Sequence, residues 1–243
     1  MPYRRLPNTD NARLKSLRKA LDKGKEIPPF KLAFTQSTLT RVQALLPSYE
    51  NALSEHKTAY NLQIEKNKDY HKAMKKAKTY ISHFIQVINM SIQRGEMNQD
   101  LRSFFGLPEG EKKLPPLNSE KDILYWSEKL MEGEQKRMMK GMSPITNPTI
   151  AVVKVHSDKF KDSCNFQSNL VKRVKRAQED LSEKRKEADM IIQQLWNEVE
   201  DTFKDLPEEL KRNKASEYGV VYVFRKNELN QFDVLNKLHV DIS

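Results

Sequence analysis

Clusters of lysine and arginine are the residues of this 243-residue chain whose type and spacing could do chemistry. Residues 57–78 hold seven lysines against two acidic residues, and residues 168–189 hold seven basic against five acidic residues. Closely spaced ammonium and guanidinium groups bind phosphates and carboxylates. The candidate contact residues for a nucleic acid or an acidic partner are Lys66, Lys68, Lys72, Lys75, Lys76, Lys172, Arg173, Lys175 and Arg176.

Patterns typical of catalysis or metal binding are absent from the sequence. The five histidines are scattered, and the sequence contains no H-E-x-x-H, G-x-x-x-x-G-K-S/T, G-x-G-x-x-G or paired C-x-x-C motif. The single cysteine, Cys164, has no partner for a disulfide framework, and its heptad position predicts a buried, inert thiol. We therefore expect no enzyme activity, no cofactor and no metal site.

Two stretches of heptad-spaced apolar residues must position the basic clusters. They run from Leu39 to Ser91 and from Ile150 to Thr202, and neither is interrupted by glycine or by proline after Pro47. This periodicity predicts an all-α fold built on two long, coiled-coil-like helices over residues 38–94 and 148–206. The alternative is a compact bundle in which each long helix breaks near its polar middle, at residues 65–69 in the first.

The connection between the two long helices favours antiparallel pairing. Residue n of the first would then face about residue 243 minus n of the second, because this register brings the apolar stretches together. Residues 57–78 and 168–189 would meet, and their lysines and arginines would form a basic central patch.

An internal duplication is indicated by matches between the two halves of the chain. A shift of 111 residues places Leu39 on Ile150 and Ile81 on Ile192. We predict a first repeat over residues 1–112 with a short helix at 8–23, and a second over 113–219 with a short helix at 119–139. The short helices should thicken the paired long helices, and the two repeats should form one structural unit.

The C-terminal tail, residues 220–243, differs in composition from the rest. Residues 220–224 are β-branched or aromatic, and a second such run covers residues 232–235. The tail predicts either a small β hairpin or one strand that docks on the helices, and an exposed strand edge there could recruit a partner.

Composition and charge narrow the class of protein. The formal net charge is +10, with 37% hydrophobic and 31% charged residues, which is typical of thinly covered helices. Neither an apolar run of about 18 residues nor a signal-peptide pattern occurs, so we expect a soluble, cytoplasmic protein without membrane contact.

Several segments resemble a family of uncharacterised bacterial all-helical proteins. They are Tyr80–Val87, Ile92–Glu96, Phe105–Gly110 and Glu217–Tyr222. The resemblance extends over most of the chain and implies a stand-alone helical protein, but it implies no activity, cofactor or site residue.

Three functions remain open from the sequence. The first is a non-catalytic helical interaction or scaffold protein, acting through a protein partner or self-association. The second is sequence-independent nucleic-acid binding through the basic central patch. The third is an enzyme or ligand-binding protein with a pocket that no sequence pattern indicates.

Overall fold

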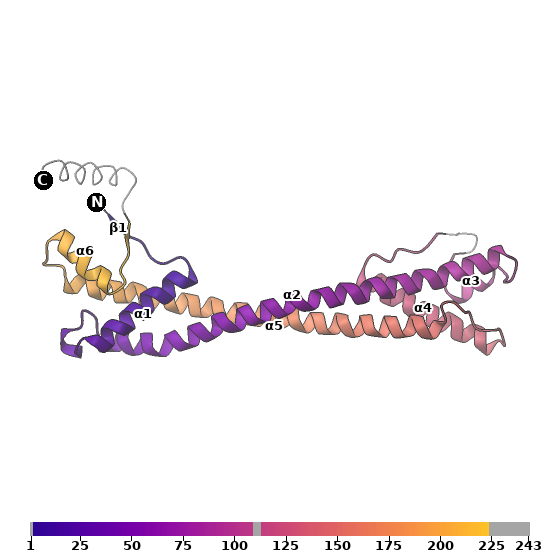
Figure 1. Ribbon diagram of the computed structural model, residues 1–243, viewed down its shortest axis with the longest axis horizontal. Helices are drawn as coiled ribbons and strands as arrows, with labels where there is room; N and C mark the ends of the chain where they lie inside the picture. Colours follow the sequence, from indigo (N-terminus) through magenta and orange to yellow (C-terminus); the bar gives the residue numbers. More distant parts are fainter. Residues whose placement is uncertain (1, 109–112, 224–243) are drawn as a thin grey trace, which may run out of the picture. The chain divides into compact units, whose positions relative to one another are not determined.

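The computed structural model describes residues 2–108 and 113–223. Long helices dominate this part of the chain, as the heptad pattern predicts (Figure 1). In chain order the elements are β1 (Tyr3–Arg4), α1 (Asp10–Glu26), the 3-10 helix η1 (Pro29–Lys31), α2 (Gln36–Gln93), α3 (Leu101–Phe104), α4 (Glu120–Met139), α5 (Ile150–Thr202), α6 (Glu208–Glu217) and β2 (Tyr222–Val223).

The two long helices, α2 and α5, are continuous. Helix α2 has 58 residues and α5 has 53, and α2 runs without interruption through residues 65–69, where the alternative fold required a break. The prediction of unbroken, antiparallel long helices is therefore confirmed. The sequence prediction did not include α6.

By internal contacts the chain divides into two compact units. Unit 1 consists of Met1–Lys57 and Arg176–Ser243, and unit 2 consists of Thr58–Lys175. Each predicted repeat contributes residues to both units. The internal duplication itself stays a prediction.

In both units the segments of α2 and α5 run antiparallel, but the predicted register is wrong by about one heptad. In unit 2 the ring of Tyr80 stacks on His156, whereas the predicted register placed Ser163 opposite it. In unit 1 Arg41 bonds to Gln194, not to a residue near Thr202. A slip of seven residues keeps one apolar seam against the other, so heptad periodicity alone does not distinguish the two registers.

Helix α1 packs tightly on α2 in unit 1. It begins after Thr9, whose hydroxyl accepts a hydrogen bond from the Ala12 N–H, and it continues past Gly24, where the sequence predicted its end. A β-carbon built on Gly24 would lie 2.4 Å from Cδ1 of Leu39 on α2. The glycine is thus required by close helix packing and not by a helix stop.

The core of unit 1 combines α1, α2 and α5 with the end of α6. Leu17 of α1, Val42 and Tyr49 of α2, and Trp196 and Val199 of α5 are fully buried in it. These side chains come from both stretches of the chain that form unit 1, so its core depends on both.

The β-like character predicted for the tail appears in β2. This strand pairs antiparallel with β1, with Tyr3 opposite Val223. Glu200 of α5 anchors the pair, because its carboxylate accepts hydrogen bonds from Arg4 (2.8 Å) and from the Tyr222 hydroxyl (2.6 Å). The second predicted strand run, residues 232–235, lies outside the described residues.

Unit 2 is built on α2 and α5 with α3 and α4. Ile81, Phe84 and Ile88 of α2 share a buried cluster with residues of α5 and α4. Ser119 and Asp122 form a capping box at the start of α4, which lies where the sequence predicted the second short helix. Short helices therefore thicken the helix pair in this unit too.

A buried ion pair joins α4 to the segment that follows it. The guanidinium of Arg137 donates to the Glu134 carboxylate, and both side chains are almost fully buried, at 3% and 1% exposed. The Ile145 N–H donates to the other Glu134 oxygen at 2.7 Å, and Arg137 also donates to the Ser143 carbonyl. Each charge is thus buried with hydrogen-bond partners.

Candidate binding groove

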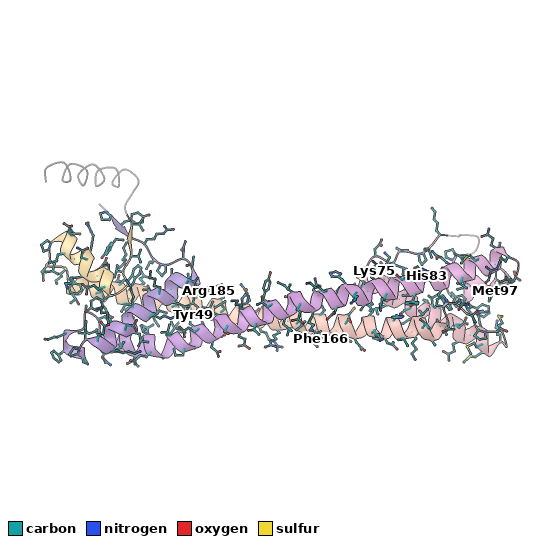
Figure 2. All side chains as sticks on the ribbon, in the orientation of Figure 1. Tyr49, Lys75, His83, Met97, Phe166 and Arg185 are labelled. Atoms are coloured by element: carbon teal, nitrogen blue, oxygen red, sulfur yellow. The ribbon has the colours of Figure 1, made fainter. Side chains whose placement is uncertain are left out.

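Three of the nine predicted basic residues line one hollowed surface. Lys66, Lys72 and Lys76 of α2 line a continuous depression between α2 and α5 of unit 2. Lys68 and Lys75 are exposed on α2 but do not line it, and in the view of Figure 2 Lys75 and Phe166 lie at opposite edges of the helix pair. Lys172, Arg173 and Lys175 are exposed on α5 of unit 2 and also lie outside the depression, and Arg176 belongs to unit 1.

This depression, which we call the groove, consists of two adjoining hollows of about 350 and 360 Å³. They share Asp69, Asp162 and Ser163 as lining residues. The complete lining is Lys66, Asp69, Tyr70, Lys72, Ala73 and Lys76 from α2, and His156, Lys159, Asp162, Ser163, Phe166 and Gln167 from α5.

Helix α4 leaves the groove open. Its first residue, Glu120, accepts a hydrogen bond from the Tyr70 hydroxyl, and Asn118 just before it accepts one from Lys78. No described residue of α4 is part of the groove lining. The groove is therefore a surface of the helix pair that unit 2 does not itself fill.

The charges in the groove are unevenly compensated. The ammonium of Lys66 lies 3.0 Å from Glu65 and 3.8 Å from Asp69. Among the described residues, by contrast, no carboxylate forms an ion pair with Lys72, Lys76 or Lys159. These three ammonium groups are available to an incoming carboxylate or phosphate.

His156 sits at one end of the groove and stacks on Tyr80, with 4.2 Å between ring centroids and 6° between ring planes. Burial lowers the pKa of His156, and the positive charges of Lys76 and Lys159 lower it further. The imidazole is therefore neutral near pH 7 and offers an aromatic surface, not a charge.

Phe166 adds an apolar contact at the opposite end. Its side chain is 50% exposed although it lines the groove. An exposed aromatic residue in a groove that also contains lysines is typical of a surface that binds amphipathic partners.

The groove offers little for catalysis. Cys164, the neighbour of Ser163, is half-buried, and burial raises the pKa of its thiol to about 11. It is therefore protonated at neutral pH and a weak nucleophile. Across residues 2–108 and 113–223, no three histidine, cysteine or acidic side chains come together in a way that could hold a metal ion.

His156, Lys159, Asp162 and Phe166 are groove residues that the sequence did not indicate. All four lie on α5 before residue 168, where the predicted register located the basic cluster. A register shifted by one heptad would have placed these four residues opposite residues 70–80 of α2. The sequence contains no signal that selects this register, since both keep the seams in contact.

The fold defines an all-helical protein of long, paired helices with one short strand pair. Comparisons with protein-family models, with curated proteins and with solved structures found no match. The resemblance of Tyr80–Val87 and the other segments to a bacterial helical family therefore stays a prediction. Within the described residues, no helix is both long enough and apolar enough to cross a membrane.

Proposed function

We propose that this chain is a non-catalytic, cytoplasmic helical interaction protein whose groove in unit 2 binds an acidic, amphipathic helical segment of a partner protein. One observation carries the proposal. Lys72, Lys76 and Lys159 have no described carboxylate partner, and they surround an open groove that also contains the half-exposed Phe166.

The dimensions of the groove suit a helix. Its lining on α2 extends from Lys66 to Lys76, eleven residues that span about 15 Å at the rise of an α-helix. A partner helix of two to three turns could lie along it, with apolar side chains at Phe166 and Ala73 and carboxylates at the lysines. Recognition through a helix in a groove relies on such a combination of anchors and charges.

The runner-up is sequence-independent nucleic-acid binding, which the exposed Lys68, Lys75 and Lys172 support. Two features favour a protein partner instead. Asp69 and Asp162 lie within the groove, where a basic side chain of a partner helix could pair with them, whereas a nucleic-acid backbone offers only phosphates. The rings of Tyr80 and His156 stack on each other, which leaves less aromatic surface for bases.

A charge-reversal experiment separates these possibilities. The groove variant is K72E/K76E/K159E, and the matched control is K68E/K75E/K154E, which changes the net charge equally at exposed positions outside the groove. Fluorescence anisotropy would measure binding of a designed Leu/Glu amphipathic helical peptide, a scrambled peptide of the same composition, and random-sequence single- and double-stranded DNA. Circular dichroism would verify that both variants remain folded.

We expect the wild-type protein to bind the amphipathic peptide more tightly than it binds the scrambled peptide. The groove variant should weaken this binding at least about tenfold, since charged hydrogen bonds are lost, whereas the control should change it much less. Failure of the peptide to bind at about 50 mM salt would contradict the proposal. DNA binding that both variants weaken equally, with a steep salt dependence, would favour the runner-up.

A further inference from the structure

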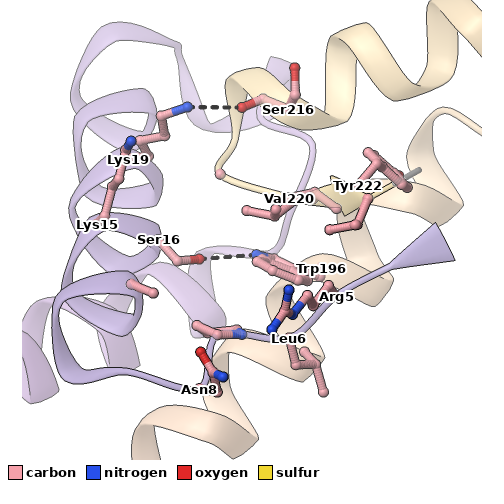
Figure 3. Close-up of a pocket in the computed structure, with 15 residues that line it drawn as sticks. Arg5, Leu6, Asn8, Lys15, Ser16, Lys19, Trp196, Ser216, Val220 and Tyr222 are labelled. Atoms are coloured by element: carbon pink, nitrogen blue, oxygen red, sulfur yellow. Dashed lines mark hydrogen bonds between the residues drawn. The ribbon is translucent and has the colours of Figure 1, made fainter. Parts of the chain in front are cut away.

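A second hollow lies in unit 1, between α1, the segment before it, Trp196 of α5 and β2. Its volume is about 480 Å³, within the range of pockets that hold small molecules. Figure 3 shows Lys15 and Lys19 on α1 at one side of this pocket and Arg5, from the N-terminal segment, at the other. It shares no residue with the groove and so carries an independent inference.

This pocket is lined by both apolar and polar side chains. Leu6 and Val221 are its exposed apolar lining residues, at 42% and 49% exposed, whereas Trp196 borders it as a fully buried side chain. The indole N–H of Trp196 is bonded to Ser16 Oγ at 3.0 Å (Figure 3), so it is not an unsatisfied donor. Gly219, with φ of +95°, brings the chain so close to α1 that an added β-carbon would lie 3.2 Å from the Ser16 carbonyl oxygen.

The polar part of the pocket carries charge of one sign. Arg5, Lys15 and Lys19 line it, and no acidic residue does. Lys19 donates to the Ser216 carbonyl at 3.2 Å, but none of the three forms an ion pair with a carboxylate in the described part of the chain.

Three arginines of unit 1 form ion pairs, in contrast to the cations at this pocket. Arg4 pairs with Glu200, Arg13 with Asp189 and Arg18 with Glu50, each within 2.8 Å. The pocket instead places three cations without a carboxylate partner among the described residues at a single hollow. Such a site stabilises a negative charge more than its surroundings do.

We propose that this pocket binds a small amphipathic organic acid. The apolar body of the ligand would contact Leu6 and Val221, next to the buried Trp196, and its carboxylate would accept charge-assisted hydrogen bonds from Arg5 and Lys15. A pocket with both cations and apolar surface should bind such an acid better than an uncharged molecule of the same length, which leaves the cations without a partner. It should also bind the acid better than a small anion, which does not cover the apolar surface.

Trp196 provides the readout. The chain has two tryptophans, and Trp126→Phe leaves Trp196 as the only one, so its fluorescence reports on the pocket alone. Octanoate is the probe, octan-1-ol is the neutral analogue of equal length, and acetate is the anion without an apolar body. The titrations use the full chain at constant ionic strength.

Three variants in the Trp126→Phe background test the assignment. Arg5→Gln with Lys15→Gln removes two cations of the pocket, and Lys25→Gln with Lys204→Gln removes two exposed cations elsewhere as the matched control. Ala12→Leu enlarges a side chain that lines the pocket. Thermal melts identify any variant that fails to fold, and Lys15→Gln alone is then the substitute.

We expect octanoate to change Trp196 fluorescence saturably and to bind at least about tenfold more tightly than octanol or acetate. The pocket charge variant should weaken octanoate binding at least about tenfold and leave octanol binding unchanged. Ala12→Leu should weaken the binding of both octanoate and octanol, and the control variant should change neither. Absence of a saturable change with millimolar octanoate, or equal affinity for octanol, would overturn the proposal.

Discussion

The hydroxyl of Tyr49 on α2 donates a 2.8 Å hydrogen bond to Asp10, the first residue of α1. The same carboxylate accepts two hydrogen bonds from Arg185 of α5, at 2.8 and 2.7 Å, so one side chain joins the three main helices of unit 1. Figure 2 shows Tyr49 and Arg185 in this region. Hydrogen bonding to Arg185 lowers the pKa of Asp10, and burial together with the Asp10 carboxylate raises the pKa of Tyr49.

Asp10 should therefore make the stability of unit 1 depend on pH. Because its folded-state pKa is below the ordinary value of 3.8, its contribution is fully present well above pH 4 and disappears as the pH falls through the lowered pKa. Asp10→Asn should reduce the free energy of unfolding by about 1–3 kcal/mol at pH 7, and the difference from wild type should vanish at the lowest pH. Urea unfolding of the wild type and of Asp10→Asn at several pH values between 7 and 2.5 measures the difference in unfolding free energy.

The matched control for Asp10 is Glu209→Gln, an exposed carboxylate in the first turn of α6. We expect its unfolding free energy to follow that of the wild type at every pH. A difference between wild type and Asp10→Asn that is the same at pH 7 and pH 2.5 would show that the ion pair does not stabilise the fold.

Gly24→Ala should destabilise unit 1 although alanine is the better helix former. The new methyl group would overlap Leu39, which is 4% exposed and cannot move freely. Overpacking of this kind costs about 1–3 kcal/mol, against a gain of about 1 kcal/mol in helix propensity. In a Leu39→Ala background the same substitution should be neutral or stabilising. Thermal melts of the wild type, the two single variants and the double variant form a double-mutant cycle that measures this. A cost that persists without the Leu39 side chain would refute the packing explanation.

A further prediction concerns the buried Glu134–Arg137 ion pair in unit 2. Glu134→Gln leaves Arg137 buried without a counter-charge and should cost about 3–5 kcal/mol of unfolding free energy. Adding Arg137→Met removes the uncompensated cation, while the amide oxygen of the new glutamine can still accept from the Ile145 N–H. The double variant should therefore be more stable than the single one in denaturant titrations. A double variant that is less stable would mean that Arg137 contributes mainly through other contacts.

Heptad spacing predicted the long helices, and the connection between them predicted their antiparallel pairing. Heptad spacing could not predict the register, because the alternatives preserve the same seam and differ only in polar pairs such as Asn67 with Gln167. The sequence suggests a helix stop at Gly24, but the role of this glycine depends on Leu39, a tertiary neighbour. Local sequence patterns do not encode such contacts.

The candidate groove was predictable only in part. Charge clustering pointed to Lys66, Lys72 and Lys76, but charge alone does not say which face of a helix a lysine occupies, and Lys68 and Lys75 lie outside the groove. Phe166 and His156 look ordinary in the sequence, since their importance comes from their position opposite α2. The unit 1 pocket assembles from three distant parts of the chain, residues 5–19, Trp196 and residues 216–223, and no sequence pattern indicated it.

The division into units also bears on how the chain is made. Residues 58–175 are contiguous, so unit 2 can complete its core while synthesis continues. Unit 1 cannot, because the core around Leu17 and Val42 also requires Trp196 and Val199. Synthesis of the 142 residues from Thr58 to Val199 takes roughly 7 to 28 s at about 5–20 residues per second. During this time the apolar seam of α2 near Leu46 lacks the α5 residues that cover it in the folded protein, so apolar surface of nascent residues 1–57 stays exposed to aggregation and to chaperones.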